Sequence, residues 1–321
     1  MAYTLYLKGR HCWNERSKHA LADAVKYFKE AVERDPAFAL AYSGLADTYS
    51  VLADHGYIQA DVGFANAKDA AKRAIELGDT LAETHTSMGV ILFHDWDWRG
   101  TEAEFTKAVK ANPNYATAHQ WYSLYLAALG RLDEAVKQAK LAEDLDPLSP
   151  SIHSCLGGHY YAAGQYSEAI EEFNKALELE PNFAPAHAQR YYVYMVKSMF
   201  DEALADLRHW LPGVPPAMAA IMESQHQSYV CAASGRLEEA KSLLKECEEN
   251  VAGERDQDLD RGVMANFMVL NYKLGNRSRA FEWLSKFIQM RMLTPIEVKC
   301  DPFFSQVASD PKFEELIGTK G

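Results

Sequence analysis

The sequence predicts an all-α protein, built as a solenoid of antiparallel helix pairs. The first observation is a period of 34 residues, which separates the members of the pairs Gly130 and Gly164, Ala135 and Ala169, Ala142 and Ala176, and Pro147 and Pro181. The second is the helical spacing of leucine and aromatic residues between these positions, which gives each helix one apolar stripe. A fixed period of this length is typical of two-helix repeats that stack on their neighbours.

Each unit is expected to contain a first helix, a glycine turn, a second helix and a break at proline. Gly130 and Gly164 follow the first helices of their units, where glycine accepts the left-handed conformation that commonly ends a helix. Pro147 and Pro181 cannot continue a helix but suit the opening turn of the next one. The alanines at the paired positions let the two helices approach closely.

The same frame covers the whole chain, which we interpret as one domain of about eight units spanning residues 1–321. The units are expected to start near residues 2, 37, 82, 116, 150, 184, 217 and 256, and residues 301–321 to form a short capping helix over the last apolar face. About nine extra residues fall around 54–64 and about three within 13–21. A longer helix with a wider turn is the favoured explanation, and an extra partner surface is the alternative.

Composition excludes several classes of function. The net charge is −12 and no Lys/Arg-rich block occurs, so no binding to nucleic acid is expected. The five cysteines form no C-x-x-C pair, which fits a reducing compartment. No apolar run approaches the roughly 18 residues of a membrane span, and the N-terminus lacks the apolar region of a signal peptide. We therefore expect a cytoplasmic chain without membrane contact.

No enzymatic constellation is present in the sequence. It contains no G-x-x-x-x-G-K-[ST], H-E-x-x-H or G-x-S-x-G motif, so we expect neither catalysis nor a cofactor. Four histidines share the 34-residue period: His85, His119, His153 and His187. Zinc ligands must converge to about 2.0–2.1 Å from one ion, whereas equivalent side chains of stacked helices stay roughly 8–10 Å apart. These histidines are therefore expected to pack between helices with a local hydrogen bond and to bind no metal.

At this point the sequence resembles the tetratricopeptide repeat family. The fifth unit carries nearly the whole family pattern in Leu156, Gly157, Tyr160, Ala169, Phe173, Ala176 and Pro181. The sixth unit has Arg190 and Tyr191 where Leu-Gly is usual, which indicates either altered helix packing or a locally polar environment. Stretches such as "HDWDWRGTEAEF" and "NPNYATAHQWYSLYLAALGR" further resemble a C-terminal segment of bacterial winged-helix transcriptional regulators and class III adenylate cyclases.

The resemblance implies a right-handed superhelix whose first helices line a concave groove. It also implies a non-catalytic scaffold that binds a protein or extended peptide there, as the regulatory part of a bacterial signalling or transcription-regulating system. A small-ligand-sensing module that controls an effector is the alternative, and self-association stays open. Transferring the family's groove positions to this chain gives the candidate partner-binding residues His94, Gln120, Leu124, Ser154, Tyr161, Tyr192, Gln225, Tyr229 and Tyr272.

Overall fold

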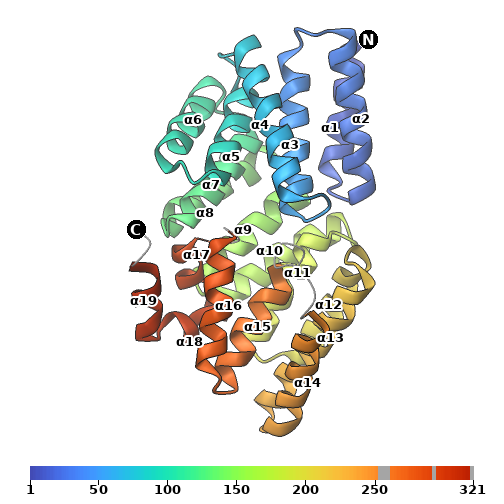
Figure 1. The fold of residues 1–321 in the computed structure, drawn as a ribbon. Coiled ribbons are helices and arrows are strands. Elements are labelled where there is room, and N and C mark those ends of the chain that lie inside the picture. The colour runs from blue at the N-terminus through green and yellow to red at the C-terminus, as the bar shows by residue number, and fades with distance from the viewer. Residues whose placement is uncertain (252–260, 291–293, 319–321) are drawn as a thin grey trace. The chain divides into compact units, whose positions relative to one another are not determined.

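The protein is all-helical, as the sequence predicts. The computed structural model describes residues 1–251, 261–290 and 294–318, and helices are the regular elements throughout these ranges (Figure 1). None of the described helices is both long and apolar enough to cross a membrane.

Helices alternate as first and second members of antiparallel pairs. The first helices are α1 (Ala2–Asn14), α3 (Ala39–Asp54), α5 (Ala82–His94), α7 (Ala116–Ala128), α9 (Pro150–Ala162), α11 (Ala184–Val196), α13 (Pro216–Ala233) and α15 (Arg261–Lys273). The second helices are α2 (Lys18–Arg34), α4 (Ala60–Leu77), α6 (Trp98–Ala111), α8 (Leu132–Leu145), α10 (Tyr166–Leu179), α12 (Phe200–Trp210), α14 (Leu237–Val251) and α16 (Arg277–Gln289). A three-residue helix η1 (Leu211–Gly213) follows α12. The unit start expected near residue 256 lies outside the described residues.

Each turn from a first to a second helix contains one residue with a left-handed backbone. Five of these residues are glycines, Gly130 and Gly164 among them, which confirms the predicted glycine turns. At the other three turns the residue carries a side chain: Arg16, Trp96 and Ser198 have φ angles of 56°, 61° and 58°. A left-handed conformation costs a residue with a Cβ roughly 1–2 kcal/mol, so these three turns store strain that the glycine turns avoid.

The extra residues around 54–64 lengthen the second pair of helices. Helices α3 and α4 contain 16 and 18 residues, against 13 and 14 in α5 and α6. The turn between α3 and α4 is also wider than those of the other pairs. The favoured explanation of the insertion is therefore confirmed, and a contact surface for a partner there stays a prediction.

The chain divides into two compact units. The first unit comprises residues 1–127, 131–156 and 175–183, and the second comprises 128–130, 157–174 and the residues from 184 onward. The first core is built on Trp13, Leu21, Phe28, Leu52 and Ile91. The second core includes Tyr191, Leu207, Phe267, Phe287 and Phe304. A single domain over 1–321 stays a prediction.

The C-terminal tail differs from the single capping helix expected for residues 301–321. It contains α17 (Pro295–Cys300), η3 (Pro302–Phe304), α18 (Ser305–Ala308) and α19 (Pro311–Gly318). The reason is that Pro302 and Pro311 cannot lie inside a helix, so a new element starts at each. The side chains of Asp301 and Asp310 accept hydrogen bonds from the amides of Phe303 and Lys312, at 2.8 and 3.0 Å, and fix these restarts.

Candidate functional site

The periodic histidines His85 and His119 each tie the two helices of one repeat together. Nδ1 of His119 lies 2.6 Å from Oε1 of Gln138 on α8, and its Nε2 lies 2.9 Å from the carbonyl oxygen of Pro113. His85 repeats the arrangement: its Nδ1 lies 2.6 Å from Oε2 of Glu104, and its Nε2 lies 2.6 Å from the carbonyl oxygen of Asp79. The side-chain partner lies 19 residues after each histidine and the carbonyl partner six before it. These contacts confirm the predicted packing role with a local hydrogen bond.

The sixth repeat extends this arrangement into an ion-pair cluster. His187 Nδ1 and Arg190 Nη2 each donate to Oδ1 of Asp206, both at 2.7 Å, and Arg190 Nε donates to Oδ2 at 2.8 Å. Burial would raise the pKa of Asp206, but the hydrogen bonds from Arg190 and His187 outweigh it, and the pKa is lowered. Of the two explanations for Arg190 in the sequence, the locally polar environment is the one observed.

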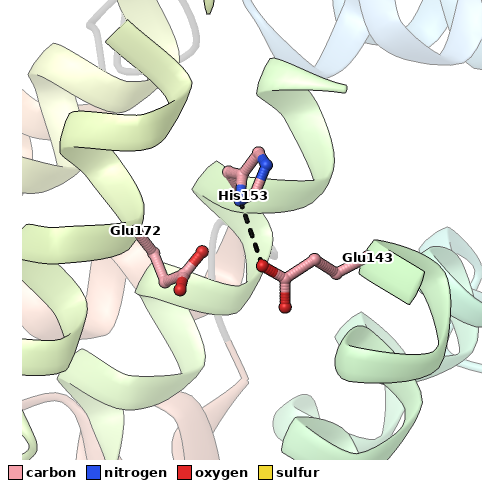
Figure 2. A group of neighbouring side chains, drawn as sticks. All are labelled: Glu143, His153 and Glu172. Atoms are coloured by element: carbon pink, nitrogen blue, oxygen red, sulfur yellow. Dashed lines mark ion pairs between the residues drawn. The ribbon is translucent and has the colours of Figure 1, made fainter. Parts of the chain in front are cut away.

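His153 occupies the equivalent position in the fifth repeat. Its Nε2 lies 2.9 Å from the carbonyl oxygen of Pro147, and its Nδ1 lies 3.6 Å from Oε1 of Glu143 (Figure 2). Lys175 Nζ also lies 3.6 Å from this carboxylate oxygen. Figure 2 also draws Glu172, which belongs to the second unit, whereas Glu143 and His153 belong to the first.

The candidate groove residues of the first unit differ in exposure. Gln120 is 7% exposed, and its Nε2 donates to the carbonyl oxygen and to Oγ of Ser151, at 3.1 and 2.7 Å. Ser154 is likewise buried, whereas Leu124 is half-buried. His94 is half-buried and its ring stacks on Phe64 of the lengthened α4. Gln120 therefore joins α7 to α9, and only His94 and Leu124 keep part of their surface accessible.

In the second unit, Gln225 lies between two first helices. Its side chain is 1% exposed, and its Nε2 donates to the carbonyl oxygen of Val263 at 2.9 Å. Its Oε1 accepts from Nδ2 of Asn266 at 3.2 Å. These bonds fasten α13 to α15, which leaves Gln225 no surface for a partner in this conformation.

The four candidate tyrosines contact a single stretch of the chain's own tail. We call Tyr161, Tyr192, Tyr229 and Tyr272 the tyrosine face, and residues 301–310 the tail segment. Tyr161 and Tyr272 contact it through their hydroxyl groups. Tyr192 and Tyr229 contact it through their rings. One tyrosine comes from each of the successive first helices α9, α11, α13 and α15.

Asp301 and Phe303 make the closest contacts with this face. The Tyr161 hydroxyl donates to Oδ1 of Asp301 at 2.7 Å and accepts the amide N–H of Phe303 at 3.1 Å. The Phe303 ring lies 5.0 Å from the ring of Tyr192 in an edge contact and 6.0 Å from that of Tyr229 in a stacked one. Burial raises the pKa of Asp301, although its hydrogen bonds from Tyr161 and Phe303 favour the charged form.

The tail segment is anchored at its other end and by the residues before it. The Tyr272 hydroxyl donates to Oδ2 of Asp310 at 3.0 Å, and Arg277 pairs with the same carboxylate. Thr294 begins α17 with a capping box and its Oγ1 donates to the carbonyl oxygen of Ala128 at 3.2 Å. The arrangement can therefore hold a segment of polypeptide by two carboxylates, a backbone amide and an aromatic ring.

Sequence reasoning located the tyrosines but missed their partners in the tail. The repeat frame assigns a groove position to each tyrosine, whereas Asp301, Phe303 and Asp310 lie beyond the last repeat, where the period carries no information. One signal was available: two Asp-Pro pairs, each followed within two residues by phenylalanine, are unusual for a plain capping helix.

Comparisons with known proteins agree with this repeat architecture. Residues 150–183 match the family model described as "Tetratricopeptide repeat". The chain is similar to "Transcriptional regulator HilA" of Salmonella typhimurium, with 24% identity over 143 residues, which make up 44% of this chain and 26% of the regulator. The match thus spans about a quarter of that protein's length.

Two solved structures share the fold at low sequence identity. The APC/C hetero-tetramer Cut9-Hcn1 matches with a TM-score of 0.63 and 12% identity, over 98% of this chain and 55% of that one. The IFIT1 monomeric mutant with Gppp-AAAA matches with a TM-score of 0.59 and 15% identity, over 85% and 70% of the two chains. Residues 150–183 thus match the model of a tetratricopeptide repeat, in a chain that has the fold of an α-solenoid of helical repeats.

Proposed function

We propose that this chain is a non-catalytic scaffold that binds a protein or extended peptide along its tyrosine face. The observation that carries the proposal is that Tyr161, Tyr192, Tyr229 and Tyr272 come from four successive first helices and contact one continuous segment of polypeptide. A face that already holds ten residues of its own chain has the spacing and chemistry to hold a segment of a partner.

Tyrosine suits such a face for physical reasons. Its large ring has few torsions to restrict on binding, and its hydroxyl supplies a hydrogen bond at the edge of the apolar contact. Stacked repeats present equivalent positions at a regular spacing, so successive side chains of an extended peptide meet successive helices. The scaffold would form the regulatory part of a bacterial signalling or transcription-regulating system, a context supported by the similarity to a transcriptional regulator.

The test is selection of linear peptides from a display library against the full chain. Enriched peptides should lose at least about tenfold in affinity on Tyr192→Ala or Tyr229→Ala, since hot-spot tyrosines contribute about 2 kcal/mol or more. Tyr3→Ala is the matched control, because Tyr3 is 59% exposed on α1 in the first unit. Its affinity should stay within about twofold of wild type.

Two outcomes would reject the scaffold. Peptides that bind Tyr192→Ala as tightly as the control would place the binding surface elsewhere. A saturable thermal shift with a metabolite, together with no enriched peptide, would replace the scaffold with a ligand-sensing module.

A further inference from the structure

We propose that the tail segment is an internal competitor of the partner, and that the partner presents an acidic residue followed by aromatic residues in the manner of Asp301-Pro302-Phe303-Phe304. The inference rests on the proposed function, since it names the partner chemistry and the regulation of the same tyrosine face. Its basis is the placement of Asp301 and Phe303 on side chains of α9, α11 and α13.

The carboxylate of the segment is recognised by Tyr161. Its hydroxyl donates to Asp301 Oδ1 at 2.7 Å while it accepts the N–H of Phe303 at 3.1 Å. One hydroxyl therefore contacts a side chain and a backbone amide two residues apart, which fixes the register of the segment. An alanine in place of Asp301 would leave the hydroxyl without its acceptor in a buried position, which is unfavourable.

The aromatic residue of the segment occupies a slot between two rings. Phe303 is 6% exposed and lies between Tyr192 and Tyr229, with centroid distances of 5.0 and 6.0 Å. Phe304 is 3% exposed and packs in the core, where its ring centroid lies 6.1 Å from that of Phe287. A partner residue in the slot needs a flat ring, because an aliphatic side chain would lose these edge and stacked contacts.

The second carboxylate extends the recognition by one more repeat. Asp310 is 4% exposed. Its carboxylate accepts a hydrogen bond from the Tyr272 hydroxyl at 3.0 Å and forms an ion pair with the guanidinium of Arg277. Between the anchors, Ser305 and Gln306 are exposed, whereas Val307 is 1% exposed and belongs to the second core. The segment thus binds through its ends and through Val307, and only Ser305 and Gln306 between them are free to vary.

The tail segment is held by these contacts rather than by its own secondary structure. Element η3 has three residues and α18 has four, and helices this short do not persist alone in water. A tethered segment has an effective concentration in the millimolar range, so it competes with a partner of similar affinity for the same face. Release of the tail should therefore lower the apparent dissociation constant of a free peptide by about tenfold or more.

The experiment uses a fluorescent peptide of residues 301–311, DPFFSQVASDP, titrated into the full chain and followed by anisotropy. The full chain with Phe303→Ala should bind it at least about tenfold more tightly than wild type, because the tail no longer fills the slot. The same peptide with alanine for its first phenylalanine should bind at least tenfold more weakly. Tyr3→Ala, which removes an exposed ring from the first unit, is the matched control and should leave the affinity within twofold of wild type.

A second measurement needs no substitution in the protein. It therefore tests whether the tail competes with the peptide even if Phe303→Ala fails to fold. The Phe303 amide donates to Tyr161 and, within the tail itself, to Asp301. In wild type, a saturating excess of peptide should accelerate hydrogen exchange of this amide, because displacement of the tail removes the bond to Tyr161 and exposes the bond to Asp301 to water. The inference would be overturned if wild type and Phe303→Ala bound the peptide with equal affinity, or if the exchange rate at Phe303 were the same with and without the peptide. If library peptides bind through Tyr192 while the 301–311 peptide binds neither wild type nor Phe303→Ala, the scaffold function is supported and the internal competitor is rejected. If neither class of peptide binds, both proposals are rejected.

Discussion

The hydroxyl of Tyr161 lies 2.7 Å from Oδ1 of Asp301, although the two residues are 140 positions apart in the chain. The contact joins the end of a central first helix to the C-terminal tail. Burial raises the pKa of both groups, so the carboxylate has lost much of its water and depends on the hydroxyl for a donor. A single hydrogen bond therefore reports whether the tail lies on the tyrosine face.

Tyr161→Phe should loosen the tail without disturbing the repeats, because the ring remains and only the hydroxyl is lost. A hydrogen bond to a charged group contributes about 1.5–3 kcal/mol, so amide exchange at Phe303 should accelerate by at least about tenfold. Hydrogen exchange followed by mass spectrometry measures this. Tyr166→Phe is the control, because it removes a hydroxyl from the ring whose centroid lies 6.2 Å from that of Tyr161. It should leave the exchange rate at Phe303 unchanged. Equal exchange in the two variants would remove Tyr161 from the set of tail anchors.

Local periodicity was sufficient to predict the helical architecture. The spacing of Gly130 and Gly164 marks the turns because glycine adopts the left-handed conformation at little cost, and both have the predicted positive φ. The N-terminus of α6 is also fixed locally, because Asp97 accepts the amide of Gly100 at 2.9 Å. Such features depend on residues close in sequence, which is why pattern reasoning reaches them.

The candidate site was only partly predictable, because its contacts are not periodic. Gln120 and Gln225 occupy groove positions in the repeat frame, but each turns its amide to a neighbouring helix and is buried there. The frame specifies which way a helix position points and not whether a neighbour covers it. Phe303 was out of reach for a different reason, since its partners Tyr192 and Tyr229 precede it by several helices.

His119→Phe should lower the stability of the fold. His119 makes two hydrogen bonds, to Gln138 and to the carbonyl oxygen of Pro113. At about 0.5–1.5 kcal/mol for each bond, the free energy of unfolding should fall by about 1–3 kcal/mol, while peptide binding at the tyrosine face stays unchanged. Urea unfolding measures the loss, with His11→Phe as the exposed control. A cost below about 0.5 kcal/mol would show that the bonds contribute nothing net.

The buried Asp206 should make stability depend on acidic pH. Burial raises its pKa, but Arg190 and His187 lower it further, so the folded value lies below that of the unfolded chain, about 3.9. The charged form stabilises the fold at pH values above about 4, and this contribution disappears as the pH falls through the folded pKa. Asp206→Asn should therefore destabilise the protein more at pH 7 than at pH 3 in urea unfolding. Asp201→Asn, at an exposed position on the same helix, should show no such difference; a cost of Asp206→Asn that is equal at both pH values would contradict the ion-pair explanation.

Two turns in equivalent positions should respond to substitution with opposite signs. Ser198 has a φ of 58° and Gly164 a φ of 74°, and a Cβ added to Gly164 meets no atom within 4 Å. Ser198→Gly should raise the free energy of unfolding by about 0.5–1 kcal/mol, since relief of the left-handed strain exceeds the added entropy of the unfolded glycine. Gly164→Ala should lower it by about 1 kcal/mol for the reverse reason. Thermal and urea unfolding of both variants measure these effects. Because Ser198 is exposed and Gly164 has open space around it, opposite signs can come only from the backbone, whereas a loss in both variants would mean that the serine side chain stabilises its turn.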